Sequence, residues 1–429
     1  MRFAHYPYAP MPPVFTPYQK FVVAVLAFLQ FTIVLDFMII SPLGALLLPA
    51  LHITTRQFGL VVSVYAFSAG ASGLLAAGFA DKFDRKRLLL FFYAGFLLGT
   101  LLCGLATSYA FLLAARIVTG VFGGVVGSIS MAIIADLFPL QVRGRVMGTI
   151  QTAFAASQVM GLPLGVILSS RWGWHAPFMM ILAVGAPVGL VIAARLQPIV
   201  EHLKVPSTRN PFRHLLATIT QGRYVQTFLA TTMLTTGGFM LMPFGSTFTA
   251  NNLGIPFETQ KWVYMSTGLV TLVAGPLLGK LADAIGKYKI FVLGTLVGAM
   301  IVGIYCNLGR TPLVTVVLIN AVLFVAITSR MISVSALVSA VPDLPDRGAF
   351  MSVNASVQQF AGGLASSVAG LIVVQAPDGH LLHYDVLGYV VVSAMMLTIA
   401  LMYPINRAVM RKAARAASAA KPPAAAAAE

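Results

Sequence analysis

One acidic side chain of this 429-residue sequence lies inside an apolar run, where a charged carboxylate is unfavourable unless it is neutralised or has a function. The sequence holds 12 Asp and Glu residues, and all except Asp36 fall in polar connectors, at the ends of apolar runs or in the terminal segments. Asp36 lies well inside an apolar run, and a carboxylate surrounded by hydrocarbon must be paired, hydrated or protonated. Because a low-dielectric environment favours the neutral form of a carboxylic acid, this position predicts a group that takes up and releases protons.

Arg116 is the expected partner of Asp36. It also lies inside an apolar run. A rise of about 1.5 Å per helical residue places both side chains about two-thirds of the way up from the end that carries the N-terminus. Ionised Asp36 would pair with Arg116 or with a cationic or polar ligand, and protonation would release that partner, so that proton and ligand compete for one group. A static ion pair that only holds two helices together is the alternative.

Arg330 is the second arginine inside an apolar run. The same helical rise puts it about 25–28 Å from the outer end of its run, near the inner edge. Two interpretations are open. Arg330 is either an interfacial arginine that extends its side chain to the cytoplasm, or part of a cavity wall that attracts anionic substrates.

Further polar and aromatic residues interrupt the apolar runs, and amides there are expected to point away from lipid. Gln151 and Gln158 are seven residues apart with Phe154 between them, and Asn354 and Gln358 are four apart, so each set is expected to share a helix face. Contact with neighbouring helices is as open as contact with a substrate. The candidate lining of a substrate cavity comprises Gln30, Tyr65, Gln151, Phe154, Gln158, Thr236, Phe239, Met240, Asn354 and Gln358.

The composition indicates that lipid is the main solvent of the chain. Hydrophobic residues make up 58% and charged residues 9%, with a mean hydropathy of +0.88, whereas a soluble protein has about 25% charged residues. Soluble enzymes, coiled coils, disulfide scaffolds and disordered chains are excluded. Apolar runs of about 20 residues, enough to span a bilayer as a helix, lie near 21–48, 57–80, 88–107, 110–135, 146–169, 177–196, 224–248, 262–282, 289–308, 312–340, 351–375 and 384–404.

We therefore expect an all-α membrane protein with 12 transmembrane helices in two pseudo-symmetric six-helix bundles. Its expected divisions are a cytoplasmic N-terminal tail (1–20), an N-terminal bundle (21–196), a cytoplasmic linker (197–223), a C-terminal bundle (224–404) and a basic, Ala-rich cytoplasmic tail (405–429).

The basic residues predict the orientation of the spans. With the N-terminus in the cytoplasm, 22 of the 28 Lys and Arg residues fall in inner segments, and only Arg56, Arg171, Lys261 and Arg310 fall in outer ones. This bias fits the positive-inside rule with both termini cytoplasmic, in a multi-pass protein of the cell (inner or plasma) membrane. The net charge of +16 is thus a topology signal, and no nucleic-acid partner is expected.

Two connectors repeat about 200 residues apart. The segments 77–86 and 279–289 place Asp81 and Asp283 202 positions apart, and Arg143-Gly144 is echoed 204 positions later by Arg347-Gly348. A parallel duplication of six spans places a transport pathway between two halves that rock against each other.

Both connectors resemble the signature loop of the major facilitator superfamily, Gly-x-Leu-Ala-Asp-Arg/Lys-x-Gly-Arg-Arg/Lys. The first copy has Ala77 and Asp84 where glycines are usual. The resemblance implies the twelve-helix fold and a cytoplasmic latch that holds the halves in the outward-open state. The residues that the resemblance assigns to this cytoplasmic gate are Asp81, Arg85, Asp136, Asp283 and Lys287.

Two shorter motifs resemble those of the drug:proton antiporters in that superfamily. Arg116-Ile-Val-Thr-Gly120 is similar to their Arg-x-x-x-Gly motif, and Gly161-Leu-Pro-Leu-Gly165 is similar to Gly-Pro-x-x-Gly, with Leu162 in place of the glycine before proline. The resemblance implies proton-coupled efflux (antiport) of a small amphiphilic compound or drug by alternating access, as in drug resistance. A proton-coupled uptake permease or a lysolipid-type facilitator of the same fold is the alternative.

Other classes of function lack their motifs. The sequence has no Gly-x4-Gly-Lys-Ser/Thr phosphate loop and no cluster of His, Asp and Glu that would build a membrane enzyme. We expect no enzyme activity, no metal and no cofactor beyond the proton gradient. The expected partners are a small-molecule substrate, protons and the lipid bilayer, with the protein a monomer. Cations, zwitterions and neutral amphiphiles all remain open as substrates.

Overall fold

The structure is a computed structural model that describes residues 15–204, 211–343 and 346–419. Most of the predicted N-terminal tail, part of the linker and the end of the basic tail lie outside these residues. Six predicted spans of the first half form α1 (Pro17–Ala50), α2 (Thr55–Phe79), α3 (Arg85–Gly104), α4 (Tyr109–Leu137), the continuous stretch α5 (Leu140–Ala156), η2 (Ser157–Gly161) and α6 (Leu162–Trp172), and α7 (Ala176–Arg195). A short turn, η1 (Ala80–Lys82), joins α2 to α3.

The second half repeats this order after a linker with η3 (Glu201–Lys204) and α8 (Pro211–Thr220). Its helices are α9 (Gly222–Leu241) followed by α10 (Gly245–Asn251), η4 (Phe257–Gln260) with α11 (Lys261–Ile285), α12 (Lys287–Tyr305), α13 (Leu313–Ala340), α14 (Arg347–Ile372) and α15 (Tyr384–Ala419). A short antiparallel hairpin, β1 (Val374–Gln375) and β2 (Leu381–Leu382), joins α14 to α15.

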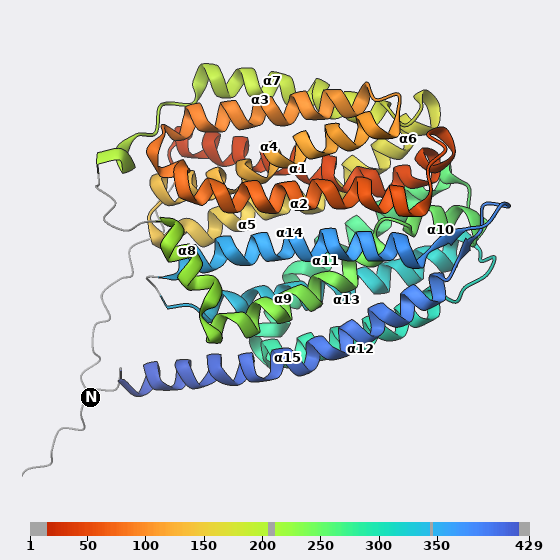
Figure 1. Ribbon diagram of the computed structural model, residues 1–429. Helices are drawn as coiled ribbons and strands as arrows, with labels where there is room; N and C mark the ends of the chain where they lie inside the picture. Colours follow the sequence, from red (N-terminus) through yellow and green to blue (C-terminus); the bar gives the residue numbers. More distant parts are fainter. Residues whose placement is uncertain (1–14, 205–210, 344–345, 420–429) are drawn as a thin grey trace, which may run out of the picture.

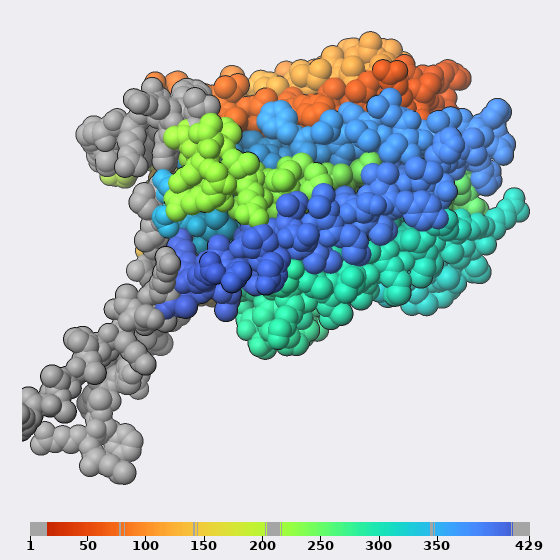
Figure 2. Space-filling model, turned by 60° about the horizontal axis from the view of Figure 1, so that its bottom comes forward, coloured from red at the N-terminus to blue at the C-terminus, as the bar shows by residue number. Residues whose placement is uncertain are grey.

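The spans run antiparallel between two ends of the molecule (Figure 1). We call the end with η3 and α8 the linker end, and the end with β1 and β2 the hairpin end. In the described part of the chain, eleven helices are long and apolar enough to cross a membrane. The more polar α14 crosses the same bundle beside α2, as Figure 2 also shows, and is the twelfth span. The predicted all-α fold of 12 transmembrane helices is confirmed.

Local sequence explains how α3 begins at the first signature connector. Asp84 occupies a position where glycine is usual in the family pattern, but its φ of −56° requires no glycine. Its carboxylate accepts from the backbone N–H of Lys86 at 3.0 Å and from that of Ile199 at 2.9 Å. Asp84 therefore caps the helix N-terminus and ties the linker to it.

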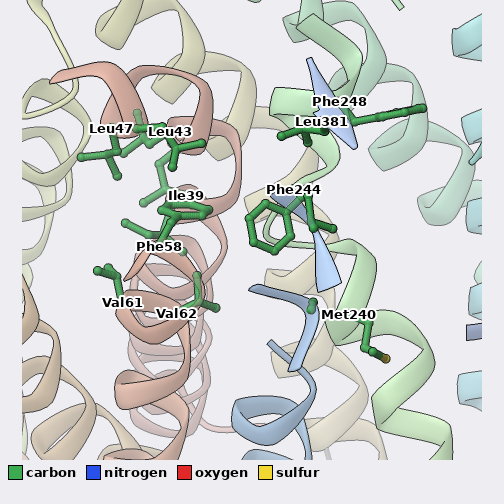
Figure 3. Packing of buried hydrophobic residues seen from close by; sticks show 14 of the residues in the cluster. Ile39, Leu43, Leu47, Phe58, Val61, Val62, Met240, Phe244, Phe248 and Leu381 are labelled. Carbon is green, nitrogen blue, oxygen red and sulfur yellow. The ribbon is translucent and has the colours of Figure 1, made fainter. Parts of the chain in front are cut away.

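Buried apolar side chains form one shared core at the hairpin end and two separate cores at the linker end. The shared core combines residues of both halves, among them Ile39, Leu43 and Phe58 facing Phe244 and Phe248 (Figure 3). At the linker end, one core is built from the first half and another from the second half. The two halves thus share one core at the hairpin end and have separate cores at the linker end, where Leu74 of α2 still packs against the second core.

Hydroxyl groups and small residues complete the hairpin-end seal between α2 and α14. Thr55 Oγ1 donates to the carbonyl of Val373 at 2.6 Å, and Ser367 donates to Ser63 at 2.8 Å. A Cβ on Gly370 would lie 2.9 Å from the Thr55 carbonyl oxygen and 3.2 Å from a backbone atom of Arg56. Because backbone atoms cannot move aside as a flexible side chain can, this glycine is required for the close approach.

Gly370→Val is therefore expected to favour the state in which the hairpin end opens. Ser63 is fully buried, so a cysteine placed there should react with a thiol reagent several-fold faster when Gly370 is Val. Gly309→Val is the matched control, because Gly309 lies at the same end with no atom near its Cβ position. Equal reaction rates in the two variants would contradict this account of the seal.

A surface cluster joins α9, α13 and α15 at the linker end. Arg223 Nη1 lies 2.7 Å from Asp343 Oδ2, and Lys412 Nζ lies 2.9 Å from Asp343 Oδ1. Lys412 also donates to the carbonyl of Pro342 at 2.9 Å. The hydrogen bonds from Lys412 and Arg223 hold the pKa of Asp343 below its usual range. The cluster fixes the extension of α15 to the end of α13.

The lowered pKa of Asp343 gives its contribution a defined pH dependence. The stabilisation is present above the unfolded-state pKa of about 3.9 and is lost as pH falls through the lower folded-state value. For ion pairs this exposed it is no more than about 1 kcal/mol. Asp343→Asn should lower the unfolding temperature at pH 7, and the difference from wild type should vanish in strong acid. A difference that persists unchanged at pH 2 would exclude the carboxylate charge as its cause.

Candidate functional site

The expected ion pair of Asp36 and Arg116 is present and completely buried. Arg116 Nη1 lies 2.8 Å from Asp36 Oδ2 and 3.3 Å from its backbone carbonyl oxygen, and both side chains are 0% exposed. The second carboxylate oxygen, Oδ1, accepts from the hydroxyl of Thr100 at 3.1 Å. Three helices, α1, α3 and α4, therefore meet at one carboxylate.

The antiporter-like motifs have a physical role in building this site. A Cβ on Gly120 would lie 2.5 Å from the carbonyl oxygen of Tyr65, so the glycine of the first motif lets α4 touch α2. A Cβ on Gly161 or Gly165 would lie within 2.5 Å of a methyl carbon of Leu35 or Ile39. The glycines of the second motif thus allow α1 to pack closely against this helix at Leu35 and Ile39, the residues that flank Asp36.

An aromatic layer separates the ion pair from the second half of the molecule. The guanidinium of Arg116 lies 4.4 Å from the ring centre of Tyr65, a cation–π contact. The ring of Phe37 lies 5.3 Å from that of Tyr65 and 5.6 Å from that of Phe239 in α9. Asp36 is 0% exposed and does not face bulk water in this conformation.

The residues predicted to line a substrate cavity differ in their exposure. Met240 is 1% exposed and lies in the shared core, so it lines no cavity in this conformation (Figure 3). Gln158 is 3% exposed, whereas Phe154 is 41% exposed and Gln151 is also exposed. The predicted common face is interrupted, because α1 and α11 pack against the π-helical turn η2 that holds Gln158.

Among the remaining lining candidates, Asn354 and Thr236 form hydrogen bonds within the second half, and Gln30 and Gln358 are half-buried. Asn354 is buried and accepts from the hydroxyl of Thr231 at 2.9 Å, so it joins α14 to α9. Thr236 donates to a carbonyl of its own helix. Gln30 and Gln358 are half-buried on α1 and α14, from opposite halves of the molecule.

The structure describes the side chains of four of the five residues predicted for the cytoplasmic gate. Arg85 is 3% exposed, lies 3.0 Å from Asp136 and donates to the carbonyl of Ala80 at 2.8 Å. The side chain of Asp81 lies outside the described residues. Asp283 and Lys287 form an exposed pair 3.9 Å apart within the second half. The ion pair of Arg85 with Asp136 lies within the first half, and that of Asp283 with Lys287 lies within the second half.

Arg330 lies inside the second half rather than at the membrane surface. It is 4% exposed, so the interpretation as an interfacial arginine that reaches the cytoplasm is wrong. Its position ten residues before the end of α13 corresponds to about 15 Å of helix, and the side chain turns inward toward α9.

The sequence interpretation missed Thr100 and the hydroxyl contacts of the hairpin-end seal. Thr100 could have been identified from the sequence, because it directly follows the Gly95-x3-Gly99 pattern and lies on its helix at a depth similar to that of Asp36. The seal had one too: Gly59-x3-Ser63 and Ser366-x3-Gly370 are pairs of small residues four apart, the pattern of close helix approach.

Two six-span halves that close on each other at one end, around a buried ion pair, define a membrane transport protein. A model of the Major Facilitator Superfamily matches residues 26–224 and 227–427. The chain belongs to this superfamily.

Individual relatives and a solved structure agree with this assignment. The chain is 30% identical over 271 residues to the uncharacterized MFS-type transporter YceJ of Bacillus subtilis, covering 62% of this chain and 68% of that protein. It is 32% identical over 148 residues to Multidrug resistance protein 3 of the same bacterium, covering 34% of this chain and 29% of that protein. A bacterial homolog of the human lysosomal transporter Spinster, inward-facing and unoccupied, superimposes with a TM-score of 0.74 at 15% identity, covering 93% of this chain and 99% of that chain. This last likeness shows the fold alone.

The protein is therefore a multi-pass membrane transporter of small molecules and not an enzyme.

Proposed function

We propose that the protein is a proton-coupled exporter of small amphiphilic compounds, in which Asp36 is the proton-exchanging group. The observation that carries this proposal is the ion pair with Arg116 at 2.8 Å, with both side chains 0% exposed. A charge pair at this depth is costly to maintain, and the two glycine motifs that resemble those of drug:proton antiporters pack around it. The name of the relative Multidrug resistance protein 3 supports export of drug-like compounds.

The ion pair supplies a switch between two conformations. Ionised Asp36 holds Arg116, and Arg116 supports the ring of Tyr65 in the aromatic layer. Protonation of Asp36 removes the charge that holds Arg116, so the layer loses its support and the relative free energies of the two conformations change. In this proposal, the conformation with the ion pair intact is the deprotonated member of the equilibrium.

An export cycle follows from the predicted orientation, in which the linker end faces the cytoplasm. Substrate enters between the halves at the linker end while Asp36 is ionised. The halves then close there and open at the hairpin end, where substrate leaves and Asp36 takes a proton from outside. The protonated protein returns, and re-formation of the ion pair with Arg116 releases the proton into the cytoplasm. No cofactor beyond the proton gradient enters this cycle, and a monomer suffices for it.

Substrate-induced proton movement tests both coupling and direction. Inside-out vesicles from cells that express the protein are acidified inside, and a pH-sensitive dye reports the gradient. The panel is tetraphenylphosphonium, taurocholate, lysophosphatidylcholine and a neutral amphiphile, with vesicles that lack the protein as control. An exporter releases interior protons when a substrate is added outside. A substrate response that appears only with the opposite gradient indicates uptake, as in the permease alternative, and contradicts the proposal.

A further inference from the structure

Arg330 is a buried cation with an unused hydrogen-bonding edge. Its side chain is 4% exposed, and Nε and Nη2 are buried with no hydrogen-bond partner in the described structure. The hydroxyl of Ser333, less than one turn further along α13, is also buried and unpartnered. In the described structure, the guanidinium of Arg330 therefore has N–H groups without an acceptor, and the neighbouring hydroxyl of Ser333 has no hydrogen-bond partner.

Apolar side chains of α15 lie near the guanidinium of Arg330. Arg330 Nη1 lies 3.9 Å from the position that a Cβ of Gly237 would occupy, and side-chain carbons of Met395 and Val391 of α15 lie 3.5 Å and 3.9 Å from that position. The adjacent hydroxyl of Ser329 donates instead to the carbonyl of Ile290 at 3.1 Å. The contacts found around this guanidinium therefore include no negative charge.

The contrast with Arg116 identifies what is missing. Arg116 is also buried, but Asp36 neutralises it at 2.8 Å. The described ion pairs include none for Arg330, so the second half carries an uncompensated positive charge inside the bundle. Removing an ion from water without a partner is strongly unfavourable, which argues that an anion meets Arg330 at some stage of the transport cycle.

We propose that Arg330 binds an oxyanion, a carboxylate, phosphate or sulfonate, through its Nε and Nη2 edge. The two N–H groups of such an edge point the same way and match two oxygens of an oxyanion in a bidentate contact. This inference rests on the proposed function and narrows it, because the transported amphiphile then carries an anionic group. The anion has two possible sources, the transported molecule and the headgroup of a membrane lipid.

Binding to the full chain in phosphatidylcholine nanodiscs tests the proposal without a proton gradient. The probes share an eight-carbon chain: octyl phosphate, octyltrimethylammonium and octyl glucoside. Octyl phosphate alone should raise the unfolding temperature of the wild type. Arg330→Gln should weaken its apparent affinity roughly ten-fold or more, as expected for the loss of charge-assisted hydrogen bonds, and Arg330→Lys should restore part of it. Arg310→Gln, which removes an exposed arginine, should leave the affinity unchanged.

A second measurement on the same proteins needs no ligand. If Arg330 is unpaired, Arg330→Met should raise the unfolding temperature of the ligand-free protein, because it removes a buried charge without leaving another one. A lower unfolding temperature, or octyl phosphate affinity that survives in Arg330→Gln, overturns the proposal.

Nanodiscs that contain phosphatidylglycerol identify the source of the anion. If this lipid raises the unfolding temperature of the wild type but not of Arg330→Gln, and also abolishes the octyl phosphate response, the oxyanion site holds a lipid headgroup and the inference about the transported molecule fails. An undiminished octyl phosphate response supports the transported molecule. Failure of either kind leaves the proton-coupling role of Asp36 untouched, because no step here depends on a gradient.

Discussion

Arg116→Met is expected to lower the free energy of unfolding by about 3–5 kcal/mol, the range measured when one partner of a buried ion pair is removed. The substitution leaves the carboxylate of Asp36 without the guanidinium that lies 2.8 Å away, and Asp36 is 0% exposed. The remaining partner, the hydroxyl of Thr100 at 3.1 Å, cannot neutralise a charge. Equilibrium unfolding of the purified protein in a defined bilayer or detergent measures the loss.

Two further variants separate the ion pair from a general packing effect. The double variant Asp36→Asn/Arg116→Met should recover much of the lost stability, because it leaves no buried charge, and the difference measures the coupling of the two residues. Arg223→Met is the matched control, since its ion pair with Asp343 is half-exposed and such pairs contribute within about 1 kcal/mol. If Arg116→Met costs no more than Arg223→Met, the buried ion pair is not a major contributor to stability.

The spans and the central ion pair could be predicted because their signals are local. Each span is an unbroken apolar run, and only a helix satisfies its backbone hydrogen bonds within one segment in lipid. Asp36 and Arg116 are conspicuous because charges inside such runs are rare, and helical rise alone gives their depth. Pairing then follows, because two opposite charges at one depth have few other partners.

The lining and the seal could not be derived in the same way. The burial of Gln158 depends on the packing of α1 and α11 against the π-helical turn at Ser157–Gly161. Met240 and Phe239 are neighbours in sequence, yet Met240 is buried within the shared core whereas the partly buried Phe239 packs at its edge and contacts Phe37. Which side of α9 meets the other half depends on the packing of both halves, and apolar residues on all sides of a span give no indication of it.

The conformation also lies beyond what sequence patterns report. The same residues must build a state closed at the hairpin end and a state closed at the linker end, and the two differ by only a few kcal/mol in a working transporter. The hydrogen bond between Thr55 and Val373 and the ion pair of Arg85 with Asp136 are described here in one of these states. A pattern that serves both states cannot indicate which one predominates.

The proton-coupling role of Asp36 is tested most directly with the variant Asp36→Asn. Asn has nearly the shape of Asp but cannot release a proton, so the variant should still bind substrate and lose substrate-induced proton release from acidified inside-out vesicles. Binding of the same compound to the purified variant, followed by its effect on the unfolding temperature, confirms that the protein is folded and the site intact. Loss of proton release with retained binding is the expected result. Undiminished proton release by Asp36→Asn, at the same protein level as wild type, would show that the coupled proton travels on another group.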